Sequence, residues 1–286
     1  MTDTTAQVPR PAVLPAPFPD ARGKTPAGLQ STRVLTRRRF FVAGINLASM
    51  AALSYGLISI FGSGGWTPAD IAIFVCFLVG APWTVMGFWN AILGLWLLHG
   101  RRDGLAATSP FVDAAESDAP IRGKTAVCMF LRNEDAERAL SRLAATRRSL
   151  NDTGYGGHFD VLVLSDSDEP DVVAAEEAAF ERWRSALGPS VRYRRRAENT
   201  GFKAGNIRDF LRRWGSDYDF FLPLDSDSVM SGRAILKLQR VMEAYPRLGI
   251  LQSLVVGAPA ESAFGRVFQF GMRAGMRSFT MGAAWW

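Results

Sequence analysis

Two aspartates lie two residues apart at the end of an apolar run, in Leu222-Pro-Leu-Asp225-Ser-Asp227. The run predicts a buried strand that ends in an acidic turn. Residues i and i+2 of a strand point to the same side, so we expect Asp225 and Asp227 to face one ligand. Two carboxylates in this arrangement can bind Mg²⁺ or Mn²⁺ together with a diphosphate. A solvated acidic turn is the alternative interpretation.

Asn133 and Glu134 follow an apolar segment that covers residues 124–131. Asn133 is either part of a ligand site or a cap of the following helix, and the residues alone leave both open. We expect Glu134 in the first turn of that helix, where a carboxylate is favoured in any case.

Asp166 follows the next apolar segment, over residues 159–164. An acidic residue at such a strand end can accept hydrogen bonds from a ribose or a uracil. Asp168, two residues further on, is a candidate cap of the next helix. We favour Asp166 as the ligand because it lies nearer to the strand.

A glycine-bearing loop, Asn199-Thr-Gly-Phe-Lys203-Ala-Gly-Asn206, runs into a predicted helix. Free amides at a helix start and a nearby lysine form a site for a diphosphate. A lysine on a solvated helix face is the alternative. Four arginines precede the loop, namely Arg192, Arg194, Arg195 and Arg196. Such arginines either neutralise phosphates or protect an edge strand from pairing with another chain.

Strands and helices alternate through this part of the chain. The apolar patterns predict strands over residues 124–131, 159–164, 191–194, 218–224 and 248–253, and helices over residues 134–150, 172–186, 203–214 and 232–245. This order predicts an α/β fold with a mostly parallel sheet covered on both faces. Ligands bind beyond the carboxyl ends of the strands in such folds, and each polar cluster above lies at such an end.

Two uncharged apolar runs, over residues 40–61 and 71–98, precede the alternating region. Each exceeds the ~20 residues that cross a bilayer core. The glycines after residue 61 and Thr67-Pro68 predict a break between two helices. We therefore predict a transmembrane hairpin over 37–102, after a disordered tail over 1–36. A linker over 103–120 and a larger domain over 121–286 follow. A signal peptide and a buried helical hairpin are the alternatives.

The charges around the two runs predict an orientation. Arginines at positions 37–39 precede the first run and arginines at 101 and 102 follow the second, whereas the connection carries only Asp70. The positive-inside rule then places both ends of the hairpin in the cytoplasm. The net charge of the 286-residue chain is +6, which suits an anionic membrane surface or an anionic substrate. No helix-turn-helix, RNP or zinc-finger pattern is present, so we expect no nucleic acid partner.

With these clusters in this order, the chain resembles the inverting family 2 glycosyltransferases with a GT-A fold. Among them it is most similar to the membrane-bound synthases of osmoregulated periplasmic glucans. The segments that carry the resemblance cover residues 206–209, 220–232, 264–270 and 284–286. The resemblance implies a UDP-glucose donor and a growing β-glucan as acceptor. It also implies a multi-pass protein in the bacterial inner membrane, with the glycosyltransferase domain in the cytoplasm.

The resemblance assigns roles to residues of this sequence. Asp166 would contact the uridine, and Lys203 the donor diphosphate. Asp225 would bind the nucleotide and help to hold a divalent metal, Mg or Mn, which Asp227 would also ligate. Asn133 and Glu134 would border the uracil pocket, although relatives usually carry a proline where this chain has residues 129–132.

The catalytic base is expected downstream of Trp286, together with a Gln-x-x-Arg-Trp motif and further transmembrane helices. We therefore interpret the chain as the N-terminal part of a longer enzyme, able to bind the donor but not to complete the transfer. Two other functions stay open. One is a processive synthase of the cellulose, chitin or hyaluronan type, and the other is a non-catalytic, membrane-anchored scaffold that binds a nucleotide sugar.

Overall fold

The structure, a computed structural model, describes residues 32–286, which form two compact units. Among these residues, the sheet unit comprises 114–251 and the hairpin unit comprises 32–113 and 252–286. Most of the predicted tail lies outside the described residues, and its residues 32–36 belong to the first helix.

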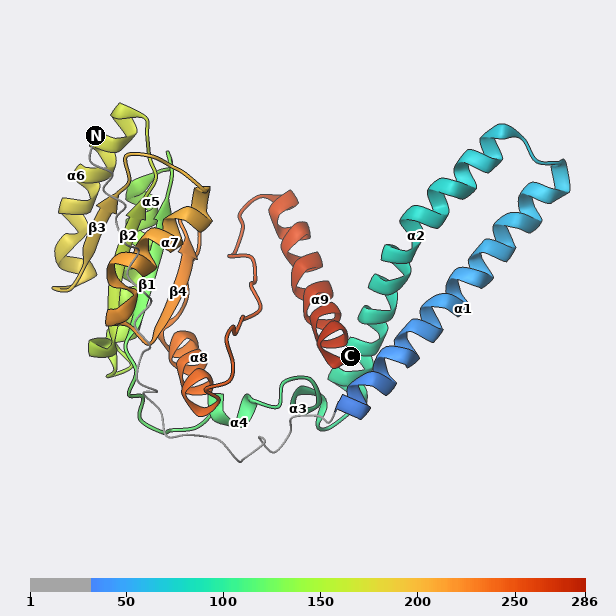
Figure 1. Ribbon diagram of the computed structural model, residues 1–286, viewed down its shortest axis with the longest axis horizontal. Helices are drawn as coiled ribbons and strands as arrows, with labels where there is room; N and C mark the ends of the chain where they lie inside the picture. Colours follow the sequence, from blue (N-terminus) through green and yellow to red (C-terminus); the bar gives the residue numbers. More distant parts are fainter. Residues whose placement is uncertain (1–31) are drawn as a thin grey trace, which may run out of the picture. The chain divides into compact units, whose positions relative to one another are not determined.

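The sheet unit contains four parallel strands in the order β3-β2-β1-β4 (Figure 1). The strands are β1 (Thr125–Leu131), β2 (Phe159–Ser165), β3 (Arg192–Arg195) and β4 (Phe220–Asp225). The helices are α5 (Ala136–Asn151), α6 (Pro170–Leu187), α7 (Phe202–Trp214) and α8 (Gly232–Ala244), with single 3-10 turns at Gly156–His158 and Gly215–Asp217.

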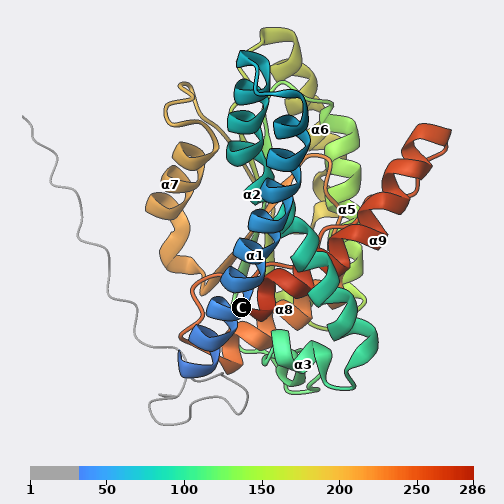
Figure 2. The same cartoon turned by 90° about the vertical axis from the view of Figure 1, so that its right-hand side faces the viewer.

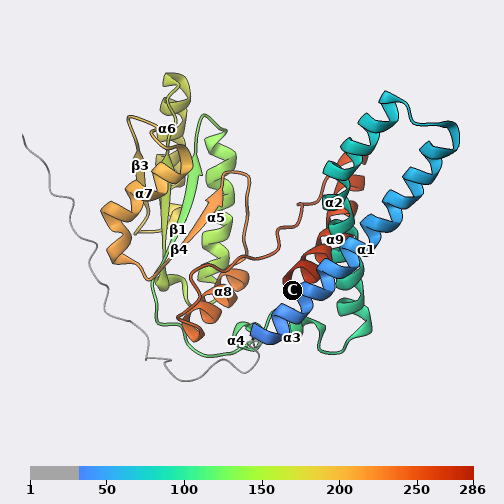
Figure 3. The same cartoon turned by 45° about the vertical axis from the view of Figure 1, so that its right-hand side comes forward.

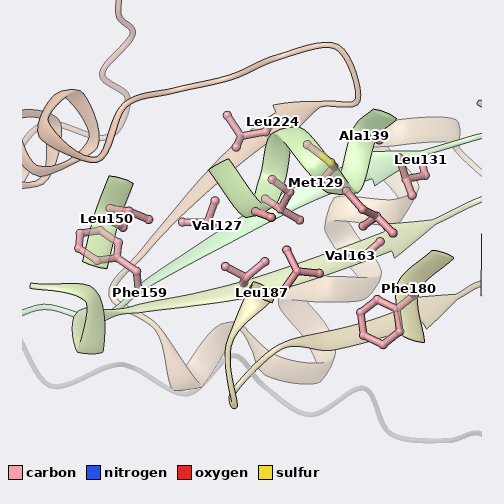
Figure 4. Close-up of a cluster of buried hydrophobic side chains, with 14 of the residues drawn as sticks. Val127, Met129, Leu131, Ala139, Leu150, Phe159, Val163, Phe180, Leu187 and Leu224 are labelled. Carbon is pink, nitrogen blue, oxygen red and sulfur yellow. The ribbon is translucent and has the colours of Figure 1, made fainter. Parts of the chain in front are cut away.

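Side chains of β1 alternate between two apolar cores. Val127 and Met129 belong to a core shared with α5, α6 and α8 (Figure 4), whereas Cys128 packs with Phe210 of α7. Figure 2 shows α7 on one side of the sheet and α5 on the other. Every residue of β1 is buried, as is typical of a parallel sheet that helices cover on both faces. The predicted α/β fold class is thus confirmed. The same burial raises the pKa of the Cys128 thiol to about 12.

The strand order reverses at β1, which brings the predicted site together. β2 and β3 lie on one side of β1 and β4 lies on the other, so the switch point falls between β1 and β4. The register pairs Leu131 with Ser165 and Phe130 with Asp225, and the carboxyl ends of the three strands therefore meet at one edge.

The strand predicted over 248–253 is wrong, because that segment has no regular secondary structure. A strand needs a neighbour whose backbone groups pair with its own, and β4 pairs only with β1 among the described residues. Most of the segment is exposed, including Ile250. Apolar composition alone did not reveal that the segment lacks a pairing partner.

The hairpin unit begins with two long helices that run antiparallel (Figure 1). α1 covers Thr32–Gly64 and α2 covers Pro68–Leu95, and α2 continues as a π-helical turn over Trp96–Gly100. Thr67 caps α2 as predicted, because its hydroxyl accepts from the Asp70 amide and its own amide donates to the Asp70 carboxylate. By length and composition, both helices are able to cross a membrane.

A third long helix, α9 (Ala263–Trp285), lies along α2 in this unit (Figures 1 and 3). The backbones approach so closely that a Cβ at Gly94 would lie 1.7 Å from the carbonyl oxygen of Ser278. A Cβ at Gly282 would lie 1.9 Å from that of Asn90. Small residues permit such close helix contacts, as in many membrane proteins. Two short helices, α3 (Gly104–Thr108) and α4 (Val112–Ala115), lie within the predicted linker, and the boundary at residue 121 stays a prediction.

Candidate functional site

A cavity of about 330 Å³ opens where the ends of β1 and β4 meet. Its lining combines charged, amide and aromatic side chains, namely Phe130, Leu131, Arg132, Glu134, Asp166, Asn199, Phe202, Lys203, Asn206, Asp225, Ser226 and Asp227. The structure thus brings every predicted ligand except Asn133 to one cavity.

Asp225 ends β4, and Asp227 follows in the turn after it. The Asp225 side chain is 64% exposed and forms an ion pair with Lys203, whose ammonium also lies 5.1 Å from the centre of the Phe130 ring. The described residues contain no group of three or more His, Cys, Asp or Glu placed to hold a metal. Two exposed carboxylates suit Mg²⁺ or Mn²⁺ that keeps waters and phosphate oxygens as its other ligands. The residues therefore fit the predicted metal only together with a diphosphate.

The start of α7 is shaped for an anion. Gly201 and Phe202 both have positive φ, at 74° and 50°, which is a strained conformation for a phenylalanine. A Cβ at Gly205 would lie 1.9 Å from the carbonyl oxygen of Thr200, so the loop folds tightly against the helix. Among the described residues no side chain caps the helix. The Phe202 amide donates to the Asn199 carbonyl at 3.3 Å, so the amides that follow it, of Lys203 and Ala204, are the ones that a phosphate can reach.

Asp166 lies at the cavity, but its carboxylate already has a cationic partner. Arg196 donates from Nε to Oδ1 and from Nη2 to Oδ2, both at 2.7 Å. The Asp166 side chain is 6% exposed and the Arg196 side chain 11%. The hydrogen bonds to Asp166 raise the pKa of Arg196. A carboxylate has further lone pairs, so Asp166 can still accept a hydrogen bond from a nucleoside.

Asn133 joins two loops instead of capping a helix. It has φ 50°, which asparagine tolerates, and its side chain binds the loop after β2. Its Nδ2 donates to the carboxylates of Asp168 and Glu169 at 2.6 and 3.0 Å, and its Oδ1 accepts from the Asp168 amide at 3.0 Å. Asn133 therefore caps no helix. Asp168 is not the cap of α6 either, because the N-cap residue of α6 is Glu169.

The cap of α5 is Asp135, whose carboxylate accepts from the Arg138 amide at 3.1 Å. Glu134 therefore precedes the helix, and its predicted place in the first helical turn is wrong. The reason is local, because the residue that can cap the first turn is the aspartate one position later.

A buried carboxylate, Glu176, is hydrogen-bonded to the loop after β2 and through it to the end of β1. Glu176 of α6 is 1% exposed and accepts from Ser167 Oγ at 2.7 Å and from the Tyr193 hydroxyl at 2.8 Å. Ser167 Oγ also accepts from the Asn133 amide at 2.9 Å, which connects Glu176 to the end of β1. Burial and the hydrogen bond to Glu176 raise the pKa of Tyr193.

Three of the four arginines lie in the edge strand β3 and Arg196 follows it directly, and the four fall into an exposed pair and a buried pair. Arg192 and Arg195 form long ion pairs on the surface, with Asp217 at 3.6 Å and with Glu177 at 3.9 Å. Arg194 and Arg196 are largely buried and contact cavity residues, and Arg194 donates to Asn206 Oδ1 at 2.6 Å. Among the described residues β3 is an edge strand, and the exposed Arg192 and Arg195 are the arginines that suit the protection of such an edge.

Sequence reasoning missed Glu176 and the aromatic residues of the cavity. Glu176 sits in a charged helix, where nothing marks one glutamate as buried. Phe202 lies inside the predicted phosphate loop, and its conformation is visible only in the structure. Strand alternation does not separate the arginines either, because Arg192 has the same parity as Arg194 and Arg196 but lies on the surface.

The parallel sheet and its switch-point cavity, with a lysine and aspartates in it, define the sheet unit as an α/β domain of GT-A type. The profile of the family described as "Glycosyl transferase family 2" matches residues 126–282, more than half of the chain. The chain belongs to glycosyl transferase family 2.

Several curated relatives carry the name glucans biosynthesis glucosyltransferase H. The protein of that name from Cupriavidus pinatubonensis is 39% identical over 94% of this chain and 30% of its own length. Those from Bradyrhizobium diazoefficiens and Vibrio cholerae are each 34% identical, over 90% and 87% of this chain and over 34% and 33% of their own lengths. The chain thus spans about a third of the length of these relatives.

Proposed function

We propose that the sheet unit binds UDP-glucose and forms the donor site of a membrane glucosyltransferase. That enzyme would build the β-glucan backbone of osmoregulated periplasmic glucans. One observation carries the proposal: the strand register and the start of α7 bring Lys203, Asp225 and Asp227 to one switch-point cavity. The name shared by the relatives favours glucan over the products of cellulose-, chitin- or hyaluronan-type synthases.

The residues of the cavity suit the donor half of an inverting transfer. In that reaction an acceptor hydroxyl attacks the anomeric carbon from the face opposite UDP, and a base removes its proton. Lys203 and the first amides of α7 would stabilise the negative charge that develops on the departing diphosphate. A metal held by Asp225 and Asp227 supplies further charge stabilisation when bound. Asp166 would orient the uridine.

The hairpin would hold this domain at the lipid bilayer. Arg38 donates to the Trp285 carbonyl at 2.8 Å, and Arg101 lies 5.4 Å from the ring of Trp96. Trp285 and Trp96 pack against each other, so arginines from both ends of the hairpin share one end of the unit. The positive-inside rule then places that end in the cytoplasm of a bacterial inner-membrane protein.

Calorimetry on the full chain in detergent micelles tests the donor site. UDP should bind with Mg²⁺ or Mn²⁺ and lose most of its affinity in EDTA. Asp225→Asn and Asp227→Asn should each weaken metal-dependent binding, by about tenfold or more for a lost charge-assisted contact. The matched control is Asp217→Asn, which removes an exposed carboxylate outside the cavity. Unchanged UDP affinity in both site variants would place the site elsewhere.

Donor competition tests the sugar. UDP-glucose should displace labelled UDP better than UDP-N-acetylglucosamine, whereas a chitin- or hyaluronan-type site would favour the second ligand.

Reporter fusions after Gly65 and after Arg102 test the orientation. A periplasmic signal from the second fusion would contradict it.

A further inference from the structure

Arg196 does not line the cavity, but it binds three residues that do, namely Asp166, Asn199 and Phe202. Besides its two bonds to Asp166, its guanidinium donates to three groups of the loop before α7. The acceptors are the Thr200 carbonyl at 3.1 Å, Asn199 Oδ1 at 3.2 Å and the Phe202 carbonyl at 3.1 Å. The backbone amide of Arg196 also donates to the Ser165 carbonyl at 3.0 Å, which fixes the residue beside the end of β2.

These contacts require a guanidinium. Its donors form a rigid planar fork, and here one edge of the fork binds a carboxylate while the remaining N–H groups reach backbone and side-chain oxygens. A lysine would keep the positive charge but presents a single nitrogen on a flexible stem, so it cannot reach both sets of acceptors. Because the pair is largely buried, water cannot easily replace the lost partners.

The two ends of this network belong to different halves of the site. Asp166 ends the strand whose polar turn is expected to meet the nucleoside. The loop of residues 199–202 leads directly into Lys203 and the first amides of α7. Gly201 and Phe202 adopt positive φ there, and such a conformation persists only where neighbouring contacts hold it. Arg196 supplies three of those contacts.

We propose that Arg196 is a positioning residue that couples the nucleoside end of the cavity to its diphosphate end. The inference rests on the proposed function. Through Arg196, the position of the Asp166 carboxylate sets the position of the loop that carries Lys203. A ligand that engages one end therefore finds the other end already ordered.

Binding of whole and partial ligands to the full chain in micelles tests the coupling. The probes are UDP, uridine, and pyrophosphate with Mg²⁺. Arg196→Lys should weaken UDP and pyrophosphate by about tenfold or more, as expected when charge-assisted hydrogen bonds are lost. Arg195→Lys is the matched control, because Arg195 is adjacent and exposed, and its ion pair with Glu177 is long, at 3.9 Å.

The decisive variant is Asp166→Asn, tested with pyrophosphate, a ligand that has no nucleoside. Coupling predicts that this variant weakens pyrophosphate binding and that the same substitution has no further effect in the Arg196→Lys background. A purely structural role would not produce this dependence on background. Amide hydrogen exchange in β1 provides the check that both variants keep the sheet folded.

The outcomes separate the two proposals. A wild-type chain that binds neither UDP nor pyrophosphate overturns the proposed donor site and this inference with it. Normal wild-type binding that Arg196→Lys leaves unchanged overturns the inference alone. The same holds if Asp166→Asn leaves pyrophosphate affinity unchanged, or if its effect is as large in the Arg196→Lys background.

Discussion

The two units differ in how much of their large apolar side chains is exposed. In the sheet unit, Phe159 is 0% exposed and lies in a core of strands and helices. In the hairpin unit, Phe40 is 75% and Val79 is 79% exposed. Apolar surface of this extent is costly in water and favourable in hydrocarbon. The same residue types thus lie in a protein core in one unit and on an exposed surface in the other, and the exposed surface is of a kind that suits lipid.

Buried polar groups differ in the same way. The sheet unit buries charges, among them Asp166 and Glu176, and surrounds them with donors. Within the described part of the hairpin unit, the buried polar side chains are the neutral Asn90 and Ser278. Asn90 Oδ1 accepts from Trp286 Nε1 at 3.0 Å. Ionised groups are rarely accepted at membrane depth, whereas the proposed donor site in the sheet unit would need them.

Removal of an aromatic ring should have the largest effect on this contrast. Phe159→Ala leaves a cavity in the sheet core and should cost about 3–5 kcal/mol of unfolding free energy. Phe40→Ala should change the stability little, because that ring faces lipid or detergent. Hydrogen exchange of β1 amides in the full chain measures the first effect, and thermal unfolding in micelles compares both. Equal losses would mean that the hairpin is packed like a soluble core.

An added charge should affect the hairpin unit more than the sheet unit, which is the opposite of the effect of removing a ring. Val79→Arg places a guanidinium in the lipid-facing part of α2 and should disfavour membrane insertion by about 2.5–3.5 kcal/mol. Leu211→Arg, on the exposed side of α7, should leave both insertion and sheet stability nearly unchanged. Carbonate extraction of membranes that contain each variant reports the difference. Full extraction resistance of Val79→Arg would argue against a spanning α2.

Most of this architecture could be predicted because its signals are periodic. Apolar runs marked four strands, and uninterrupted apolar length marked α1 and α2. Polar residues at strand ends marked most of the cavity, because parallel strands align those ends. The failed strand over 248–253 and the unforeseen Glu176 share a cause. Pairing and burial depend on partners distant in the sequence, which local patterns do not report.

Glu176 provides a prediction on buried charge. Glu176→Ala would leave the hydroxyls of Ser167 and Tyr193 without their acceptor, at a cost of about 1–3 kcal/mol. Glu176→Gln keeps one acceptor oxygen and should recover part of that loss. Glu177→Ala is the control, since Glu177 is exposed and its ion pair with Arg195 is long, at 3.9 Å. Hydrogen exchange of β2 amides should rank the three variants in that order, and equal protection in all three would contradict a structural role for Glu176.

Asp160 allows the smallest and most specific test, a dependence of stability on pH. Burial opposes ionisation of Asp160, but hydrogen bonds from Lys124, Ser190 and Tyr218 outweigh it, and the net effect lowers the pKa of Asp160. Lys124 Nζ lies 2.7 Å and the Tyr218 hydroxyl 3.0 Å from Asp160 Oδ2. The unfolded chain therefore takes up a proton at higher pH than the folded chain does. The stabilisation is complete above the ordinary aspartate pKa of about 3.9 and is lost as the pH falls through the folded value.

Asp160→Asn should consequently cost about 1 kcal/mol near neutral pH, and progressively less below pH ~4. The hairpin supplies the contrast, because its long helices carry few ionisable groups and their contribution should change little over the same range. Denaturant unfolding of both proteins at pH 7, 5, 4 and 3 measures the difference between them. Other carboxylates titrate in both proteins, so that difference isolates Asp160. A gap that stays constant or widens towards acid would show that the folded state does not favour the Asp160 carboxylate over its protonated form.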